Sequence, residues 1–121
     1  MNEKQKRMNP AKSWLMRYQD AKYQRRRLLA SGPEAREVHN ADMLKLEKTM
    51  QDVLDMISSL DNEHQRDVLM MRYIDGYPWP RVIMEMQDKG YCESMSYTMH
   101  GRALQHVAEK LQQMNSKTKQ S

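Results

Sequence analysis

Six apolar residues recur at alternating steps of three and four positions in the middle of the chain, and this spacing constrains the fold more than any other feature. The six are Met43, Leu46, Met50, Val53, Ile57 and Leu60. Such steps place apolar side chains along one seam of a helix, as in a coiled coil. The spacing predicts a helix over about residues 33–59.

A second predicted helix, over residues 11–30, precedes this one and carries a patchy apolar stripe. Between the two, Gly32 can close the first helix and Pro33 suits the first turn of the next. We therefore predict an antiparallel, coiled-coil-like hairpin over residues 11–60. Since two helices alone bury little surface, the hairpin is also the predicted surface of a homodimer.

The composition favours helices throughout the chain. Phe is absent, Met occurs 13 times, and only four Gly and four Pro occur in 121 residues. Such a composition is rich in helix formers and poor in strand formers. We predict an all-α fold with one modest core. Residues 1–10 and 115–121 lack apolar periodicity, so both ends are predicted to be disordered.

The formal charge of +4 is unevenly distributed. Residues 1–36 hold ten Lys or Arg against three Asp or Glu, residues 37–69 hold three against eight, and residues 70–121 hold seven against five. A basic amino end can follow nucleic-acid phosphates, and a solvated helix face is the alternative. The run Arg25, Arg26 and Arg27 is interpreted either as a solvated helix face or as a contact with phosphates or with an acidic partner.

A further helical unit is predicted over residues 61–114. Asp61 or Asn62 could cap its first helix, because either side chain can accept a hydrogen bond from first-turn amides. Gly76 ends that helix.

Two more helices follow in this unit. Pro78 and Pro80 fit only at the start of a helix, near residues 79–88, and Gly90 ends it. The last helix begins near residues 92–94. Its predicted apolar stripe is Met95, Met99, Ala103, Val107, Leu111 and Met114.

The last two helices have the order that a helix-turn-helix requires, in which the first packs over the second and the second reaches base edges. The predicted outward residues of the second helix are Ser94, Tyr97, Thr98, Gly101 and Arg102. Ser, Thr and Arg contact bases or phosphates, and Tyr stacks or donates. The predicted nucleic-acid-binding residues are Ser94, Tyr97, Thr98 and Arg102, with Arg81, Arg25, Arg26, Arg27 and other amino-terminal Lys and Arg residues near phosphates.

Three pieces of the C-terminal half carry a family resemblance: residues 66–76 (RDVLMMRYIDG) with Trp79, Gly90-Tyr91, and residues 100–104 (HGRAL). Together they resemble region 4 of bacterial sigma factors and, more closely, the phage ArpU-like regulators of late operons. The resemblance covers most of the chain. It implies a helical hairpin before a sigma-like helix-turn-helix, and DNA binding in transcription regulation.

The chain also departs from that family's pattern. Pro78 stands where a capping Ser or Thr is usual, and residues 87–89 lengthen the predicted turn. Ser94, Tyr97 and Thr98 occupy outward positions that are often Arg or Lys, and Glu93 adds a negative charge. Ser96 stands where the family has a buried aliphatic residue, so either the helix is rotated or Met95 replaces it in the core. Because phosphate contacts supply most of the affinity for DNA, the recognition helix is weakly charged for its task.

Two functions follow from these observations. The first is a phage or prophage-derived transcription regulator that binds DNA, with a homodimer as its expected form. The alternative is a phage-encoded interaction protein that binds and modulates RNA polymerase or a nucleic-acid-guided defence nuclease without reading DNA. An enzyme is not expected, since no nucleophile and base pair or phosphate loop stands out.

No cofactor or metal is expected, because the four His and Cys92 lack metal-ligand spacing. A single Cys cannot form an intrachain disulfide, and no apolar run indicates a signal peptide or a membrane span. We therefore expect the protein in the cytoplasm of a bacterial host, with no membrane partner.

Overall fold

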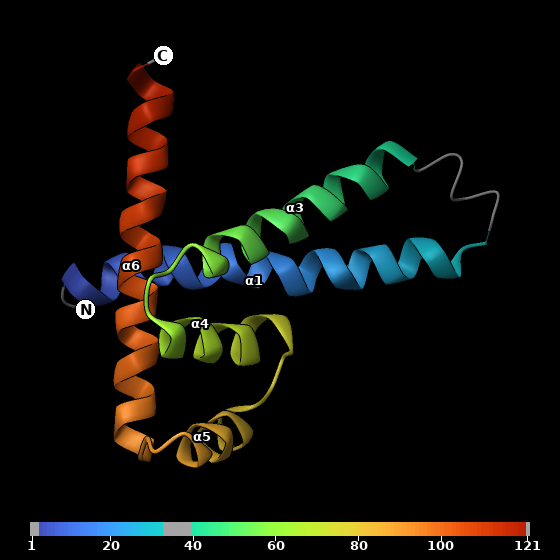
Figure 1. The fold of residues 1–121 in the computed structure, drawn as a ribbon. Helices are drawn as coiled ribbons and strands as arrows, with labels where there is room; N and C mark the ends of the chain where they lie inside the picture. The colour runs from blue at the N-terminus through green and yellow to red at the C-terminus, as the bar shows by residue number, and fades with distance from the viewer. Residues whose placement is uncertain (1–2, 33–39, 121) are drawn as a thin grey trace.

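Helices of very different length build the molecule, and two of them, at opposite ends of the chain, cross near its centre (Figure 1). The computed structural model describes residues 3–32 and 40–120. These residues contain no strand, which confirms the predicted all-α class. The elements are α1 (Glu3–Ala30), α3 (Asn40–Ser58), α4 (Glu63–Leu69), the π-helix η1 (Met70–Ile74), α5 (Trp79–Asp88) and α6 (Glu93–Gln120).

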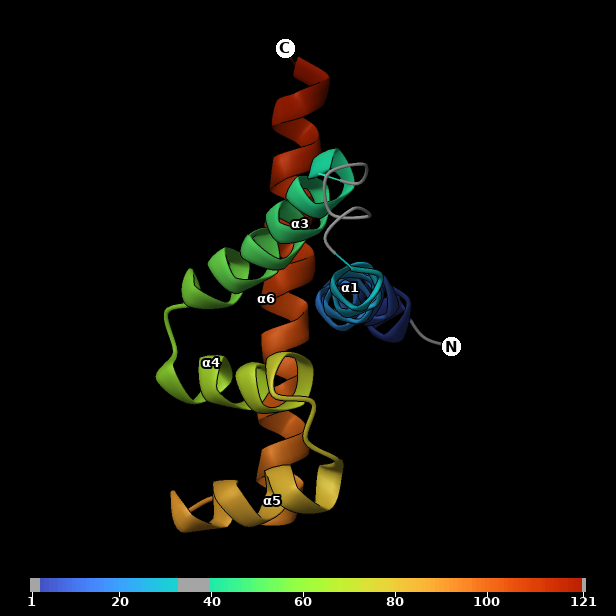
Figure 2. The same ribbon diagram turned by 90° about the vertical axis from the view of Figure 1, so that its right-hand side faces the viewer.

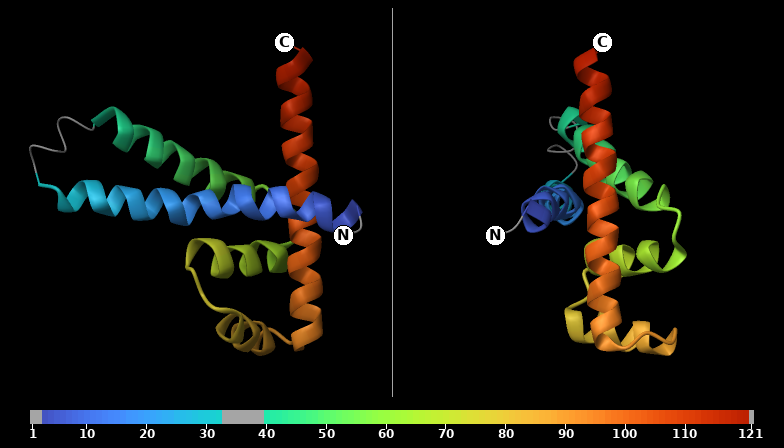
Figure 3. Two further views of the ribbon diagram at one scale, coloured as in Figure 1. Left: turned by 180° about the vertical axis from the view of Figure 1, so that it is seen from behind. Right: turned by 90° about the vertical axis from the view of Figure 1, so that its left-hand side faces the viewer.

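Helices α1 and α3 contact each other and run in opposite directions, as the predicted hairpin requires (Figures 1 and 3). Within the seam, Val53, Ile57 and Leu60 are buried. The other three seam residues, nearer the start of α3, are only half-buried, because the two helices diverge in that direction. The predicted beginning of this helix at residues 33–39 lies outside the described residues.

Both terminal helices are longer than predicted. Helix α1 begins at Glu3 rather than at residue 11, and α6 continues to Gln120 rather than ending at residue 114. Residues 3–8 are Glu, Lys, Gln, Lys, Arg and Met, which all have high helix propensity and need no apolar stripe to be helical. Helix α1 continues through Pro10, although a proline inside a helix lacks a backbone donor and its ring crowds the carbonyl four residues earlier.

The core lies where α6 passes between the other elements. Helix α6 contacts α1, α4 and α5, and the end of α3 closes the same core from one side (Figure 2). Fully buried side chains come from every layer: Leu15, Val53, Ile57, Val68, Leu69, Val82, Met86, Leu104 and Val107. A polar contact supplements this packing, since His106 Nδ1 on α6 lies 2.8 Å from Gln65 Oε1 on α4.

Asn62 begins α4 as predicted. Its side-chain oxygen accepts hydrogen bonds from the backbone N–H groups of His64, at 2.9 Å, and Gln65, at 3.0 Å. These are first-turn donors that have no partner within the helix. Of the two predicted capping residues, Asp61 and Asn62, it is Asn62 that caps α4.

The end of this helix is unusual, because α4 passes directly into the π-helix η1. The backbone N–H of Asp75 donates to the carbonyl of Met70 at 2.9 Å, and Gly76 then adopts φ +72°. Gln19 on α1 donates its Nε2 to the carbonyls of Tyr73, at 3.1 Å, and Ile74, at 2.7 Å. The hairpin therefore supplies the hydrogen bonds that the last η1 carbonyls would otherwise lack.

Helix α5 begins without a side-chain cap. Pro78 occupies the cap position, and only its carbonyl takes part, accepting from Arg81 at 3.0 Å and Val82 at 3.1 Å. Pro80 has no N–H, so it removes one of the first-turn donors that a capping hydroxyl would satisfy. Helix α5 can therefore begin after Pro78 without the capping Ser or Thr that is usual at this position in the family the sequence resembles.

Candidate nucleic-acid interface

The N-terminal half of α6 is covered on one side and open on the other. Helices α4 and α5 stack on the same side of it, while no helix of residues 3–32 or 40–120 lies against the opposite side (Figures 1 and 3). Val82 and Met86 on α5 are buried beneath α6, and Ile83 is half-buried. This arrangement of α5 and α6 is compatible with the predicted helix-turn-helix, in which α6 would be the recognition helix.

The four predicted contact residues of α6 are exposed: Ser94, Tyr97, Thr98 and Arg102. Two of the hydroxyl groups already have local partners. Thr98 Oγ1 donates to the Ser94 carbonyl at 3.0 Å, and Ser94 Oγ lies 3.3 Å from the Cys92 sulfur. This contact with Ser94 is the main cause of the lowered pKa of the Cys92 thiol. Both hydroxyls can still accept hydrogen bonds from an incoming partner.

The inward face of α6 differs from the predicted stripe. Met95 and Met114, predicted to be part of that stripe, are 46% and 53% exposed, whereas Ser96 is fully buried. Burial of Ser96 is compatible with the core because its Oγ donates to the Cys92 carbonyl at 3.0 Å. Ala103 and Val107 of the predicted stripe are buried, and Met99 and Leu111 are half-buried against the core. The other buried residues of α6 lie outside the predicted stripe: Ser96, His100, Leu104 and Ala108.

Four rings join α5, η1 and α6 beneath the open face. Tyr97 packs against Trp79 with ring centroids 4.9 Å apart, and Trp79 meets the edge of His100 at 4.7 Å. His100 Nε2 lies 2.9 Å from the hydroxyl of Tyr73. The guanidinium of Arg72 lies 5.3 Å from the Trp79 centroid. This ring cluster fixes the orientation of Tyr97, which remains 44% exposed.

The hydrogen-bonded pair in this cluster is uncharged near neutral pH. Burial, followed by the positive charges of Lys12 and Arg72, lowers the pKa of His100 to about 4. Burial raises the pKa of Tyr73 to about 12. A charged form of either ring would lose solvation in this position. The contact between His100 and Tyr73 is therefore a structural bond between neutral groups.

Arg102 on α6 and Arg81 on α5 differ in their surroundings. Arg102 is exposed on α6 and forms no ion pair with any other residue within 10–32 or 40–115. Arg81, at the start of α5, stacks over Tyr77 with its guanidinium carbon 3.9 Å from the ring centroid. Arg102 is thus free to bind, and Arg81 is held beside Tyr77 in a defined position.

The structure does not bring Arg25, Arg26 and Arg27 to this surface. They lie at the C-terminal end of α1, which extends away from α5 and from the start of α6 (Figure 3). Arg25 Nε lies 3.5 Å from Glu47 Oε1 on α3. Arg27 lies over Tyr23 at 6.0 Å. The basic run therefore belongs to the far end of the hairpin.

The turn between α5 and α6 is not lengthened as predicted. Gln87 and Asp88 continue α5, and Gly90 follows with φ +92°. The N–H groups of Gly90 and Tyr91 donate to the carbonyls of Gln87, at 2.9 Å, and Met86, at 3.0 Å. This is a Schellman motif, which ends a helix in a fixed direction. Gln87 and Asp88 therefore lengthen α5 rather than the turn, because Gly90 determines where the helix ends.

Lys89 in this turn also contacts α4. Its ammonium lies 2.9 Å from Asp67 Oδ2, and this hydrogen bond is the main cause of the raised pKa of Lys89. The contact fixes the turn to α4, on the side of the unit away from the open face of α6. No local pattern predicts this contact, because 22 positions separate Lys89 from Asp67.

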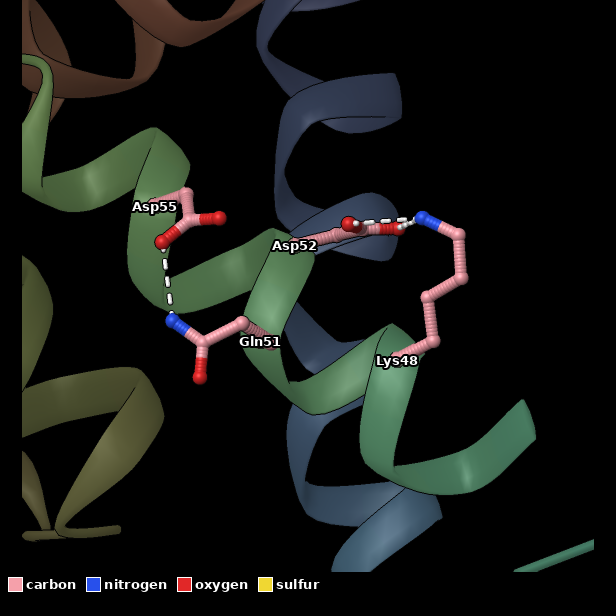
Figure 4. Close-up of polar contacts among 4 residues, drawn as sticks. All are labelled: Lys48, Gln51, Asp52 and Asp55. Atoms are coloured by element: carbon pink, nitrogen blue, oxygen red, sulfur yellow. Dashed lines mark hydrogen bonds and ion pairs between the residues drawn. The ribbon is translucent and has the colours of Figure 1, made fainter. Parts of the chain in front are cut away.

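A separate groove of about 650 Å³ lies where α1, α3 and α6 meet, with Trp14, Met56 and Met114 in its lining. Its charged side chains on α3 already contact neighbours one turn away on the same helix (Figure 4). Lys48 Nζ lies 3.2 Å from Asp52 Oδ1, and Gln51 donates to Asp55 Oδ1 at 2.8 Å. Among residues 3–32 and 40–120, no group of three or more His, Cys, Asp or Glu is placed to hold a metal ion.

The chain has no match among protein-family models, curated proteins or solved structures. None of the helices in the described part of the chain is long and apolar enough to cross a membrane.

Proposed function

We propose that the protein is a phage or prophage-derived transcription regulator that places the N-terminal half of α6 in the major groove of DNA. The observation that carries the proposal is the open face of α6, where Ser94, Thr98 and Arg102 are exposed above a helix-turn-helix packing. A major groove admits one α-helix, and its base edges are read by side chains of these types.

The exposed residues of α5 and α6 differ in the contact with DNA that each can make. Arg102 suits a bidentate contact with guanine or a contact with phosphate, and the hydroxyls of Ser94 and Thr98 can bond to several bases. Tyr97 is held against Trp79, so it offers a fixed ring edge and hydroxyl at the rim. Arg81 on α5 is placed to contact a phosphate beside the groove.

The charge on this surface determines how the affinity for DNA should depend on salt concentration. Glu93, exposed in the first turn of α6, opposes the phosphate attraction of Arg102. With few cationic contacts, the affinity for DNA should be modest and should fall with salt along a shallow slope.

The test is binding of the whole protein to sheared phage DNA, followed by fluorescence anisotropy from about 0.05 to 0.3 M salt. We expect saturable binding at the low end that weakens as salt rises. Absence of binding at the lowest salt, where nonspecific attraction is strongest, would refute the proposal.

A second candidate function is binding and modulating a host protein, either RNA polymerase or a nucleic-acid-guided defence nuclease. It is favoured by the large apolar side chains exposed on the same unit: Met84 at 55%, Met95 at 46% and Tyr97 at 44%. Exposed Met and Tyr side chains are typical of adaptable protein interfaces.

A pull-down from host lysate treated with nuclease separates the two candidates. Recovery of polymerase or of a defence nuclease without nucleic acid, lost in the variant Met95→Lys, would favour the second function. Recovery only when DNA is present would favour the first.

We further propose a homodimer through the hairpin, since Tyr23 and Leu44 are 62% and 60% exposed on α1 and α3. Sedimentation equilibrium at micromolar concentration should give twice the chain mass. The variant Leu44→Glu should give one chain mass. A wild-type protein that sediments as a single chain would remove the dimer and leave the DNA proposal standing.

A further inference from the structure

Helix α1 crosses α6 near the middle of that helix, on a flank next to the side that α4 covers (Figures 1 and 2). Ala11 and Leu15 on α1 are fully buried in the core, whereas Lys12, next to Ala11, is exposed. A basic side chain from the other end of the sequence is therefore present at this crossing.

The side of α1 on which Lys12 lies can be inferred from Gln19, which is seven residues further along the same helix. Residues seven apart lie on nearly the same side of an α-helix. Gln19 donates to the carbonyls of Tyr73 and Ile74, so this side of α1 faces η1 and the helix-turn-helix unit. Lys12 shares that side and lies nearer to the N-terminal end of α1.

An electrostatic effect places the Lys12 charge near the recognition helix. After burial, the charges of Lys12 and Arg72 are the causes that lower the pKa of His100 on α6. Arg72 is already engaged, donating to the Tyr77 carbonyl at 3.0 Å, whereas Lys12 has no hydrogen bond or ion pair with another described side chain.

We propose that Lys12 contacts a DNA phosphate beside the groove that α6 enters, so that α1 of the hairpin is the second anchor of the interface. The inference rests on the proposed function and adds to it a contact from outside the helix-turn-helix. An ammonium on a flexible four-carbon stem suits a phosphate as a point charge and carries no base preference.

This contact also gives the hairpin a role in DNA binding. The recognition helix offers few cationic side chains, and Lys12 supplies one more from a helix whose position Gln19 fixes. The contact is expected to strengthen binding to all sequences about equally.

The test compares Lys12→Gln with Lys22→Gln in the full chain. Each removes one positive charge from α1, but Lys22 lies about 15 Å further along the helix, away from α6. Binding to a fixed duplex is measured across salt concentrations, with far-UV circular dichroism and the thermal midpoint as checks on folding.

Lys12→Gln should reduce the slope of log affinity against log salt by about 0.9 and weaken binding roughly eightfold near 0.1 M salt, whereas Lys22→Gln should leave the slope unchanged. Lys12→Arg should restore wild-type binding. Wild-type binding with equal slopes in both Gln variants would overturn the inference and leave the proposed function intact. A wild-type protein that binds no DNA would overturn both.

Discussion

Gln19 Nε2 donates to the carbonyl oxygen of Ile74 over 2.7 Å, across 55 positions of sequence. With the second bond to Tyr73, this one side chain joins α1 to the π-helix η1, which precedes α5 and α6. The position of η1 relative to α1, the helix that carries Lys12, is therefore held by Gln19.

Replacing Gln19 by Leu should destabilise the protein. The change leaves two part-buried carbonyls without their donor, and we expect the free energy of unfolding to fall by about 1–3 kcal/mol. Urea denaturation at neutral pH measures it. Gln24→Leu is the matched control, since Gln24 lies exposed on the same helix and should change stability little. Equal effects of the two substitutions would contradict the proposed role of Gln19.

His100 should make stability fall in acid. Its pKa is about 4 in the folded protein and about 6.5 when unfolded, so the unfolded state binds the proton first as pH falls. The stability that neutral His100 contributes is fully present above pH 6.5 and is lost as the pH falls from about 6.5 to 4. Its size is on the order of 3 kcal/mol.

The comparison with His100→Gln isolates this effect. Gln can still bond to Tyr73 but does not titrate, so the variant should show a shallower loss of stability by urea denaturation between pH 7 and 4. If wild type and variant lose stability in parallel over this range, His100 is not the group responsible.

Gly101→Ala should stabilise the protein. Gly101 lies within α6, and a Cβ built there meets nothing within 4 Å. Alanine in a helix interior is favoured over glycine by about 0.5–1 kcal/mol. A rise in the thermal midpoint is the expected result. A fall would mean that the environment of Gly101 is more crowded than the structure shows.

The sequence predicted much of the fold because local signals set helix ends. Asn62 caps α4 through its own side chain, and Gly76 and Gly90 end their elements through positive φ, which any reader of the sequence can anticipate. The outward positions of α6 also followed from spacing, since Ser94, Thr98 and Arg102 are exposed.

The rest depends on contacts that no local pattern contains. The bonds from Gln19 to η1 and from Lys89 to Asp67 join distant positions, and helical spacing cannot pair them. Ser96 replaces Met95 in the core because its hydroxyl bonds to the Cys92 carbonyl, a compensation that hydrophobicity alone does not reveal. Spacing also could not place Arg25, Arg26 and Arg27 relative to α6.

Selection from a random duplex library measures whether the open face of α6 reads DNA sequence. Wild-type protein should enrich one sequence. Arg102→Gln should lose about 1–3 kcal/mol of preference at one position, whereas Arg26→Gln, at the far end of the hairpin, should keep the full preference. No enriched sequence, or the same preference in wild type and Arg102→Gln, would contradict the account.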